Sequence, residues 1–218
     1  MSAERSAAIS SIADAAEWRL LGLLFERPHH EWRREVATVA QEVADAGVRA
    51  AARVAQDATE GRYLAMLGPC GAVSPREVTY RSFEDPGRIL ADITGFYEAF
   101  GFHPQAEDPI DHVAVEIGFV GYLLLKEAYA RLQGDPRAAE VSATARQRFV
   151  ETHLSPLAAA LAERLNANGA DYLAQAAASL AARVPKPTAT PPVPPDGDDF
   201  SACGGCAFGE ESQEDETL

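Results

Sequence analysis

A run of apolar residues between positions 113 and 125 dictates much of the architecture, because a helix there has no polar face. Glu116 is the only charged residue in the run. The large apolar side chains fall on every side of a helix: Val113, Val115, Ile117, Phe119, Val120, Tyr122, Leu123, Leu124 and Leu125. A helix that is apolar all round is buried all round. We therefore predict a helix from Pro109 to about Gly134 that lies at the centre of a bundle.

The other helical patterns are shorter and amphipathic, as expected of helices that cover a central one. They run over about residues 11–26, 31–58 with a break at Gly47, 63–67, 88–100, 135–154, 155–168 and 170–184. Ser155 is predicted to cap the helix that Pro156 begins, and Gly101 and Gly169 are predicted to end helices. Alanine is abundant and β-branched runs are few, which favours helix over strand. The chain is thus predicted to be an all-α, single-domain helical bundle.

Three regions follow one another along the chain. Residues 1–184 are predicted to form one helical domain, which is long enough to bury a core without a metal or a disulfide. Residues 185–199 read PKPTATPPVPPDGDD, a proline-rich linker. Residues 200–218 are predicted to be a disordered acidic tail that contains a C-x-x-C pair. Within the helical domain, the turn-rich segment 68–87 is predicted to be a loop that docks through Tyr80 and Phe83.

The charge of the chain is strongly acidic. The formal net charge is −14, and eight of the carboxylates lie between Asp196 and Glu216, where there is no Lys or Arg. The rest of the chain therefore carries about −6. An acidic body repels the phosphates of nucleic acids and of anionic membranes. It fits a basic partner, and it also fits a role in solubility alone.

Nothing in the sequence indicates export or membrane insertion. The only apolar run near the N-terminus, Leu20 to Phe25, is short and contains Gly22, so no signal peptide is predicted. No stretch approaches the roughly 18 apolar residues of a membrane span. Three cysteines without an export signal are typical of a reducing compartment. We therefore expect a cytoplasmic protein.

The segment EDPIDHVAVE, which runs into the central apolar helix, carries four carboxylates, a proline and a histidine. Helix capping explains much of it. Asp108 is a good N-cap and Pro109 suits the first helical position. The charge of Asp111 suits the positive end of a helix, and His112 and Glu116 are one turn apart and can pair. Helix capping does not explain Glu107, the first residue of the segment. Nor does it explain why an ionisable histidine lies where the helix enters the core.

The same segment contains side chains that could in principle bind a metal ion or take part in catalysis. A metal site would have two ligands here, His112 and Glu116, and no second histidine-rich segment completes a set. Asp111 and His112 have no serine or cysteine nucleophile in a recognisable turn, and there is no phosphate-binding loop. We predict that the chain is not an enzyme, and we retain a hydrolase using these two residues as an alternative.

Four segments, in order along the chain, resemble the TorD/DmsD/NarJ family of redox-enzyme maturation chaperones. The first is a Pro-x-Glu-x-x-Tyr element after a Gly-Pro loop, and the second is a Phe-Tyr-x-x-x-Gly helix end. The third is the Glu, Pro, Asp-His, Glu signature, and the fourth is a Phe-x-x-x-His-Leu-x-Pro element. The matching residues are Pro75, Glu77 and Tyr80; Phe96, Tyr97 and Gly101; Glu107, Pro109, Asp111, His112, Glu116 and Phe119; and Phe149, His153, Leu154 and Pro156.

The resemblance implies a cytoplasmic helical chaperone that binds the N-terminal region of a molybdopterin oxidoreductase catalytic subunit. That region is often a twin-arginine export signal, and the chaperone assists cofactor insertion and delays export. The carboxylates would attract arginines, and an apolar groove would hold the rest of the leader. His112 would hold the loop in place, or titrate and tune release. The implied client-binding residues are Tyr80, Tyr97, Glu107, Asp108, Pro109, Asp111, His112 and Glu116. No cofactor of its own is implied, and a homodimer is compatible.

The tail supports a rival hypothesis. Cys203 and Cys206 form a C-x-x-C pair between glycines and acidic residues. Two thiolates are half of a zinc site, and a second copy or a client would have to supply the other half. The rival is a small metal- or thiol-dependent redox protein that acts through these two cysteines.

Overall fold

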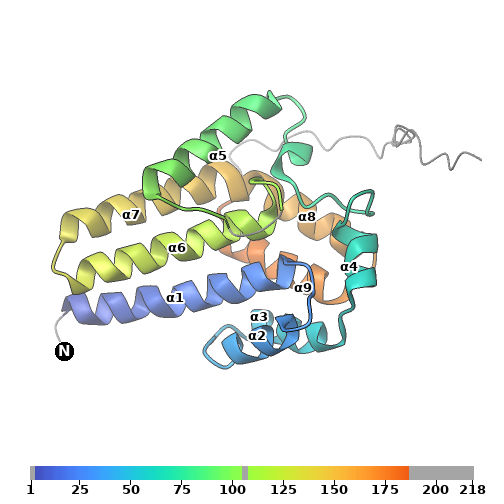
Figure 1. The fold of residues 1–218 in the computed structure, drawn as a ribbon, viewed down its shortest axis with the longest axis horizontal. Helices are drawn as coiled ribbons and strands as arrows, with labels where there is room; N and C mark the ends of the chain where they lie inside the picture. Colours follow the sequence, from blue (N-terminus) through green and yellow to red (C-terminus); the bar gives the residue numbers. More distant parts are fainter. Residues whose placement is uncertain (1–2, 105–107, 187–218) are drawn as a thin grey trace, which may run out of the picture.

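The computed structural model describes residues 3–104 and 108–186 (Figure 1). Over these residues the chain forms helices and no β-strand, which confirms the predicted all-α, single-domain bundle. The α-helices are α1 (Ala3–Phe25), α2 (Trp32–Val39), α3 (Ala46–Val54), α4 (Glu60–Leu67), α5 (Pro86–Phe100), α6 (Val113–Leu132), α7 (Pro136–Phe149), α8 (Ser155–Ala167) and α9 (Asp171–Arg183). Shorter turns are the 3-10 helices η1 (Ala55–Asp57) and η2 (Glu77–Tyr80) and the π-helical turn η3 (Val150–Leu154).

The central helix is α6, as predicted. Its most extensive contact is with α1, and α7 packs along another side (Figure 1). Gly22 of α1 lets these two helices approach closely, because a Cβ there would lie 3.3 Å from the Ile117 side chain. Aromatic rings of α5 and α7 meet α6 around Phe119, whose ring centroid lies 4.7 Å from that of Phe149 and 4.8 Å from that of Tyr97. This aromatic cluster joins three helices at the core.

The prediction that α6 is buried on every side is wrong for its last two turns. Leu125, Tyr129 and Leu132 are each more than half exposed. Their spacing places them on one face of the helix, and no described helix covers that face. The first half of α6, which is buried, is the part that positions the site described below.

The smaller helices form a second group against this core. α8 and α9 pack against each other, and α9 also contacts α3 and α1. The predicted break at Gly47 is wrong, because Gly47 lies inside α3. The break falls at residues 40–45, and the Asp45 carboxylate caps α3 by accepting a hydrogen bond of 2.8 Å from the Val48 amide. The predicted helix ends at Gly101 and Gly169 are confirmed, since both residues have positive φ.

The predicted N-cap at Ser155 is also wrong. α7 continues through η3 into α8, with helical backbone angles at Leu154 and Ser155. The Ser155 hydroxyl instead donates to the carbonyl of Pro185. Pro156 has no amide proton for a regular α-helical hydrogen bond, and the wider π-helical turn before it accommodates that loss. The continuous helix carries His153 on its inner face, fully buried.

The loop before α5 docks through one of the two predicted residues. Tyr80 is buried, and its hydroxyl donates a hydrogen bond of 2.7 Å to the Ser74 carbonyl. Phe83 is 81% exposed, so its predicted docking is wrong. The loop needs only one aromatic anchor because η2 is also held by polar contacts described below.

Two further sequence predictions concern membrane insertion and the C-terminal segment. No helix within residues 3–104 and 108–186 is long and apolar enough to cross a membrane. Most of the predicted linker, and the whole tail with Cys203 and Cys206, lie outside the described residues. A metal or redox role for the two cysteines, and the domain boundaries, therefore stay predictions.

Candidate functional site

The start of α6 differs from the prediction. α6 begins at Val113, and the residue that caps it is His112, whose Nδ1 accepts a hydrogen bond of 3.2 Å from the Ala114 amide. Asp108 and Pro109, which were predicted as N-cap and first helical residue, lie ahead of the helix. The capping interpretation of those two residues is therefore wrong.

The reason lies in a loop 35 residues earlier in the chain. The Glu77 amide donates to the Asp111 carbonyl at 2.9 Å, and the Val113 amide donates to the Pro75 carbonyl at 2.9 Å. These two bonds form an isolated antiparallel bridge between Arg76 and His112. Because this pairing holds His112 in an extended conformation, the helix cannot begin before it.

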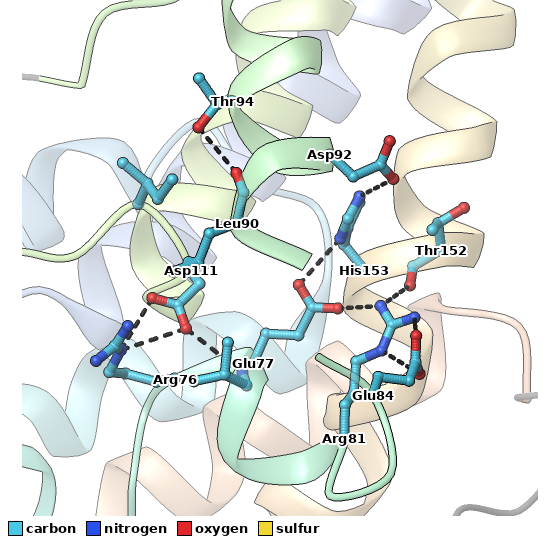
Figure 2. A network of polar contacts seen from close by, with 12 residues as sticks. Arg76, Glu77, Arg81, Glu84, Leu90, Asp92, Thr94, Asp111, Thr152 and His153 are labelled. Carbon is cyan, nitrogen blue, oxygen red and sulfur yellow. Dashed lines mark hydrogen bonds and ion pairs between the residues drawn. The ribbon is translucent and has the colours of Figure 1, made fainter. Parts of the chain in front are cut away.

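Asp111 is fully buried beneath this bridge and is bound by an arginine. Arg76 Nε donates to both carboxylate oxygens, at 2.9 and 3.2 Å (Figure 2). The Val78 amide adds a longer contact of 3.4 Å. The Asp111 side chain is 0% exposed, whereas the Arg76 side chain is 40% exposed. The arginine thus covers the carboxylate and separates it from solvent.

Glu77 is the centre of a second set of contacts, deeper in the molecule (Figure 2). One of its oxygens accepts from Arg81 Nη1 at 2.5 Å, and the other lies 3.0 Å from Nδ1 of His153. Arg81 Nη1 also donates to the Thr152 carbonyl at 2.9 Å. The side chains of Glu77 and His153 are fully buried. These contacts tie η2 to the π-helical turn η3, far along the sequence.

Glu116, on the first turn of α6, is buried without a donor. Among the described residues, no group donates a hydrogen bond to either of its oxygens, so the predicted pairing with His112 does not form. Burial, together with the nearby charges of Glu77 and Asp111, raises the pKa of the Glu116 carboxyl well above its usual range. Both effects favour the neutral, protonated form of this carboxyl group. Two carboxyl groups can lie together here because only one is charged.

Glu116→Gln is expected to remove part of the pH dependence of stability. The folded protein holds a proton on Glu116 that the unfolded chain releases above about pH 4.5. The wild type therefore loses stability as pH rises toward the raised pKa, with a slope of at most about 1.4 kcal/mol per pH unit from this group. Glutamine does not titrate, so the stability of the variant relative to the wild type should increase with pH. Urea denaturation of both proteins between about pH 5 and about pH 8 measures this difference, and parallel curves would contradict the assignment.

His112 is held as a neutral group. Burial lowers the pKa of its imidazole, although the Asp108 and Asp111 carboxylates oppose that shift. Its Nδ1 must be unprotonated, because this nitrogen accepts the Ala114 amide at the cap of α6. Of the two roles that the sequence left open for His112, this geometry favours holding the loop over titrating near neutral pH.

The structure brings together most of the predicted site residues but places several of them below the surface. Tyr97 is buried, and its hydroxyl donates to the Ile110 carbonyl at 3.0 Å, which holds the segment ahead of α6. Tyr80 is buried as well, so both tyrosines support the site from within. Pro109 is exposed and Asp108 is half-buried, whereas Glu107 lies outside the described residues. A role of these residues in client binding stays a prediction.

Sequence reasoning missed four residues of the network as site residues. Glu77 and His153 carried a signal, since both belong to the segments that resemble the chaperone family. Arg76 and Arg81 carried none, because an arginine in a turn-rich loop is usually solvated. Their role follows only from the carboxylates that the fold places beside them.

A groove of about 880 Å³ opens beside the first turns of α6. Its apolar lining includes Phe102, Pro104 and Val115, and its polar lining includes carboxylates, arginines and two histidines. The complete lining is Arg19, Glu26, Arg27, Pro28, His29, His30, Glu60, Phe102, Pro104, Asp108, Ala114, Val115 and Gly118. Asp108 and Ala114 of this lining flank the bridged segment 111–113 in the chain.

Comparison with known families gives one match. The family model described as nitrate reductase delta subunit matches residues 27–163, more than half of the chain. The chain belongs to the nitrate reductase delta subunit family. Proteins of this family are molybdoenzyme maturation chaperones, which confirms the resemblance found in the sequence. No curated protein and no solved structure gives a significant match.

The part matched by the nitrate reductase delta subunit family contains the whole polar network. It begins just after α1 and ends within α8, and it includes both the Arg76–Asp111 pair and the contacts of Glu77 with Arg81 and His153. The family consists of chaperones and not of catalysts. At the level of the family, this agrees with the prediction that the chain is not an enzyme. Its partners are molybdoenzyme subunits of the nitrate reductase type.

Proposed function

We propose that this chaperone binds the N-terminal leader of a molybdopterin oxidoreductase catalytic subunit in the groove beside α6. Binding would shield the client while its cofactor is inserted and would delay export of clients that carry a twin-arginine signal. We place this activity in the cytoplasm and assign no catalysis to the chain. The observation that carries the proposal is a groove in which an apolar floor and carboxylates lie together at the start of the central helix.

The dimensions and lining of the groove support a peptide ligand. Its volume of about 880 Å³ is at the upper end of the range for sites that enclose a ligand. Phe102, Pro104 and Val115 offer an apolar surface for the hydrophobic part of a leader. Asp108 lies at the same groove and adds negative charge for arginines.

Two further carboxylates of the groove are held in exchangeable pairs. Glu26 is bound by Arg19 at 2.6 Å, and Glu60 is bound by Arg27. All four side chains are partly exposed, and exposed ion pairs are worth less than about 1 kcal/mol. The arginines of a basic leader can therefore compete for these carboxylates at little expense.

Gly118→Leu is expected to block the groove without harming the fold. Gly118 lines the groove, and a Cβ there would meet nothing closer than the tip of Phe102 at 4.0 Å. A leucine in this helical position also has a higher helix propensity than glycine. We expect the affinity for a leader peptide to fall by at least about tenfold, which is about 1.4 kcal/mol. Calorimetric titration with the N-terminal peptide of a nitrate reductase-type catalytic subunit measures the change.

A matched control is available in α5. Gly95 is a helical glycine that is exposed, whereas Gly118 is half-buried; a Cβ at Gly95 would meet nothing within 4 Å, and Gly95 does not line the groove. Gly95→Leu should bind the leader like the wild type, and both variants should unfold at or above the wild-type temperature. Equal binding by Gly118→Leu and the wild type would place the leader elsewhere.

A further inference from the structure

We propose that Arg76 is an internal substitute for a client arginine, and that the leader binds by displacing the Arg76 guanidinium from Asp111. The inference rests on the proposed function, since it names the group of the client that the site takes. The buried Asp111 carboxylate would then have two alternative partners, the guanidinium of Arg76 and the guanidinium of a client arginine.

The geometry of the pair supports exchange. Arg76 reaches Asp111 through Nε alone, and this single N–H is shared between the two carboxylate oxygens at 2.9 and 3.2 Å. A guanidinium that approaches end-on can give one N–H to each oxygen, which is the stronger, two-pronged arrangement. An incoming arginine can therefore make a better contact with Asp111 than Arg76 makes.

Asp111 requires a cation whichever arginine supplies it. Its side chain is 0% exposed, and within residues 3–104 and 108–186 it receives, apart from Arg76, only the long 3.4 Å contact from the Val78 amide. An ionised carboxylate buried without a partner is strongly unfavourable. The position is therefore selective for a group with the charge and planar donors of arginine.

Arg76 is the arginine that can leave. Its side chain is 40% exposed, and among the described residues it contacts no carboxylate other than Asp111. Arg81, by contrast, is 13% exposed and binds Glu77, Glu84 and the Thr152 carbonyl. Displacing Arg76 outward leaves the deeper contacts around Glu77 in place, whereas displacing Arg81 would break them.

The Arg76–Asp111 pair belongs to the same chain segment as part of the groove lining. Asp108, Ala114 and Val115 line the groove, and Asp111 lies between Asp108 and Ala114 in the chain. Arg76 faces His112 across the antiparallel bridge at this same point. Neither Arg76 nor Asp111 lines the groove itself, so the proposal requires an arginine of the leader to extend from the groove past Asp108 and Ala114 to the carboxylate that Arg76 covers.

The test uses Arg76→Ala, Arg76→Lys and methylguanidinium as a probe that requires no client. Arg76→Ala should unfold at a lower temperature than the wild type, and millimolar methylguanidinium should restore much of that loss. Methylammonium, which has the charge without the planar fork, should restore less. The double variant Arg76→Ala with Asp111→Asn has no buried charge to neutralise, so methylguanidinium should not stabilise it.

Leader affinity gives the second readout. Because the internal competitor is gone, Arg76→Ala should bind the leader peptide about tenfold more tightly than the wild type. Arg76→Lys, which keeps the fold with a weaker competitor, should fall between them. Arg34→Ala, which removes an exposed pair with Glu31, should bind like the wild type.

Either of two results would overturn the proposal. One is a failure of methylguanidinium to stabilise Arg76→Ala beyond methylammonium. The other is leader binding by both Arg76 variants that is no tighter than that of the wild type, which would make Arg76 a purely structural residue. If the wild type binds no leader at all, the proposed function fails, and methylguanidinium alone then decides whether Asp111 accepts an external guanidinium.

Discussion

Replacing Arg81 by methionine is expected to lower the free energy of unfolding by about 3–5 kcal/mol, the range for breaking a buried ion pair. Arg81 donates to Glu77 and to the Thr152 carbonyl, and the Glu77 side chain is 0% exposed. Methionine keeps much of the apolar stem but leaves the Glu77 charge with His153 as its remaining partner. Urea denaturation at neutral pH measures the loss.

The control for this prediction is Arg34→Met. Arg34 pairs with Glu31 at 2.9 Å, close to the distance of the buried pair, but the two side chains are 75% and 48% exposed. Pairs of that kind contribute less than about 1 kcal/mol. Similar losses for both variants would mean that burial does not set the strength of the Arg81 contact.

Phe119→Ala is expected to destabilise the fold by about 3–5 kcal/mol, as large-to-small changes of a buried aromatic do. Phe119 is fully buried in α6, and its ring packs against Tyr97 of α5 and Phe149 of α7. The substitution leaves a cavity where three helices meet, and the rigid rings around it cannot close the space. Chemical denaturation measures the change.

Phe83→Ala is the matched control for the aromatic cluster. It removes the same atoms from a side chain that is 81% exposed, so the free energy of unfolding should change by less than about 0.5 kcal/mol. A large loss would show that Phe83 packs in solution, as the sequence analysis expected. A small loss for Phe119→Ala would instead show that the core can relax around the cavity.

Much of the fold could be predicted because helical periodicity is a local property. The apolar run of α6, the amphipathic stripes of the other helices and the glycines at positions 101 and 169 can each be read within about one helical length of chain. The predictions made from the local sequence at Ser155 and Asp108 were wrong. Both have the side chain of a good N-cap, but the chain at Ser155 continues as a helix, and Asp108 is kept out of one by pairing farther along.

The candidate site could be predicted in part. The resemblance pointed to the right segments, and the structure brings those segments together at the start of α6. The separation into a buried network and an open groove could not be predicted, because it depends on which distant residues meet. Asp111 and Asp108 are three positions apart in sequence, yet one is sealed under Arg76 and the other lines the groove.

The sequence by itself determined the helical class, the central position of α6 and the family, since periodicity and motif order are properties of the chain read along its length. Only the tertiary structure decided the electrostatic state of each acidic residue. The fold pairs Asp111 with the Arg76 guanidinium, whereas it buries Glu116 near Glu77 without a donor among the described residues, which raises the pKa of the Glu116 carboxyl. The charge of a carboxyl group depends on its solvent and its neighbours in space, and the order of residues along the chain does not contain that information.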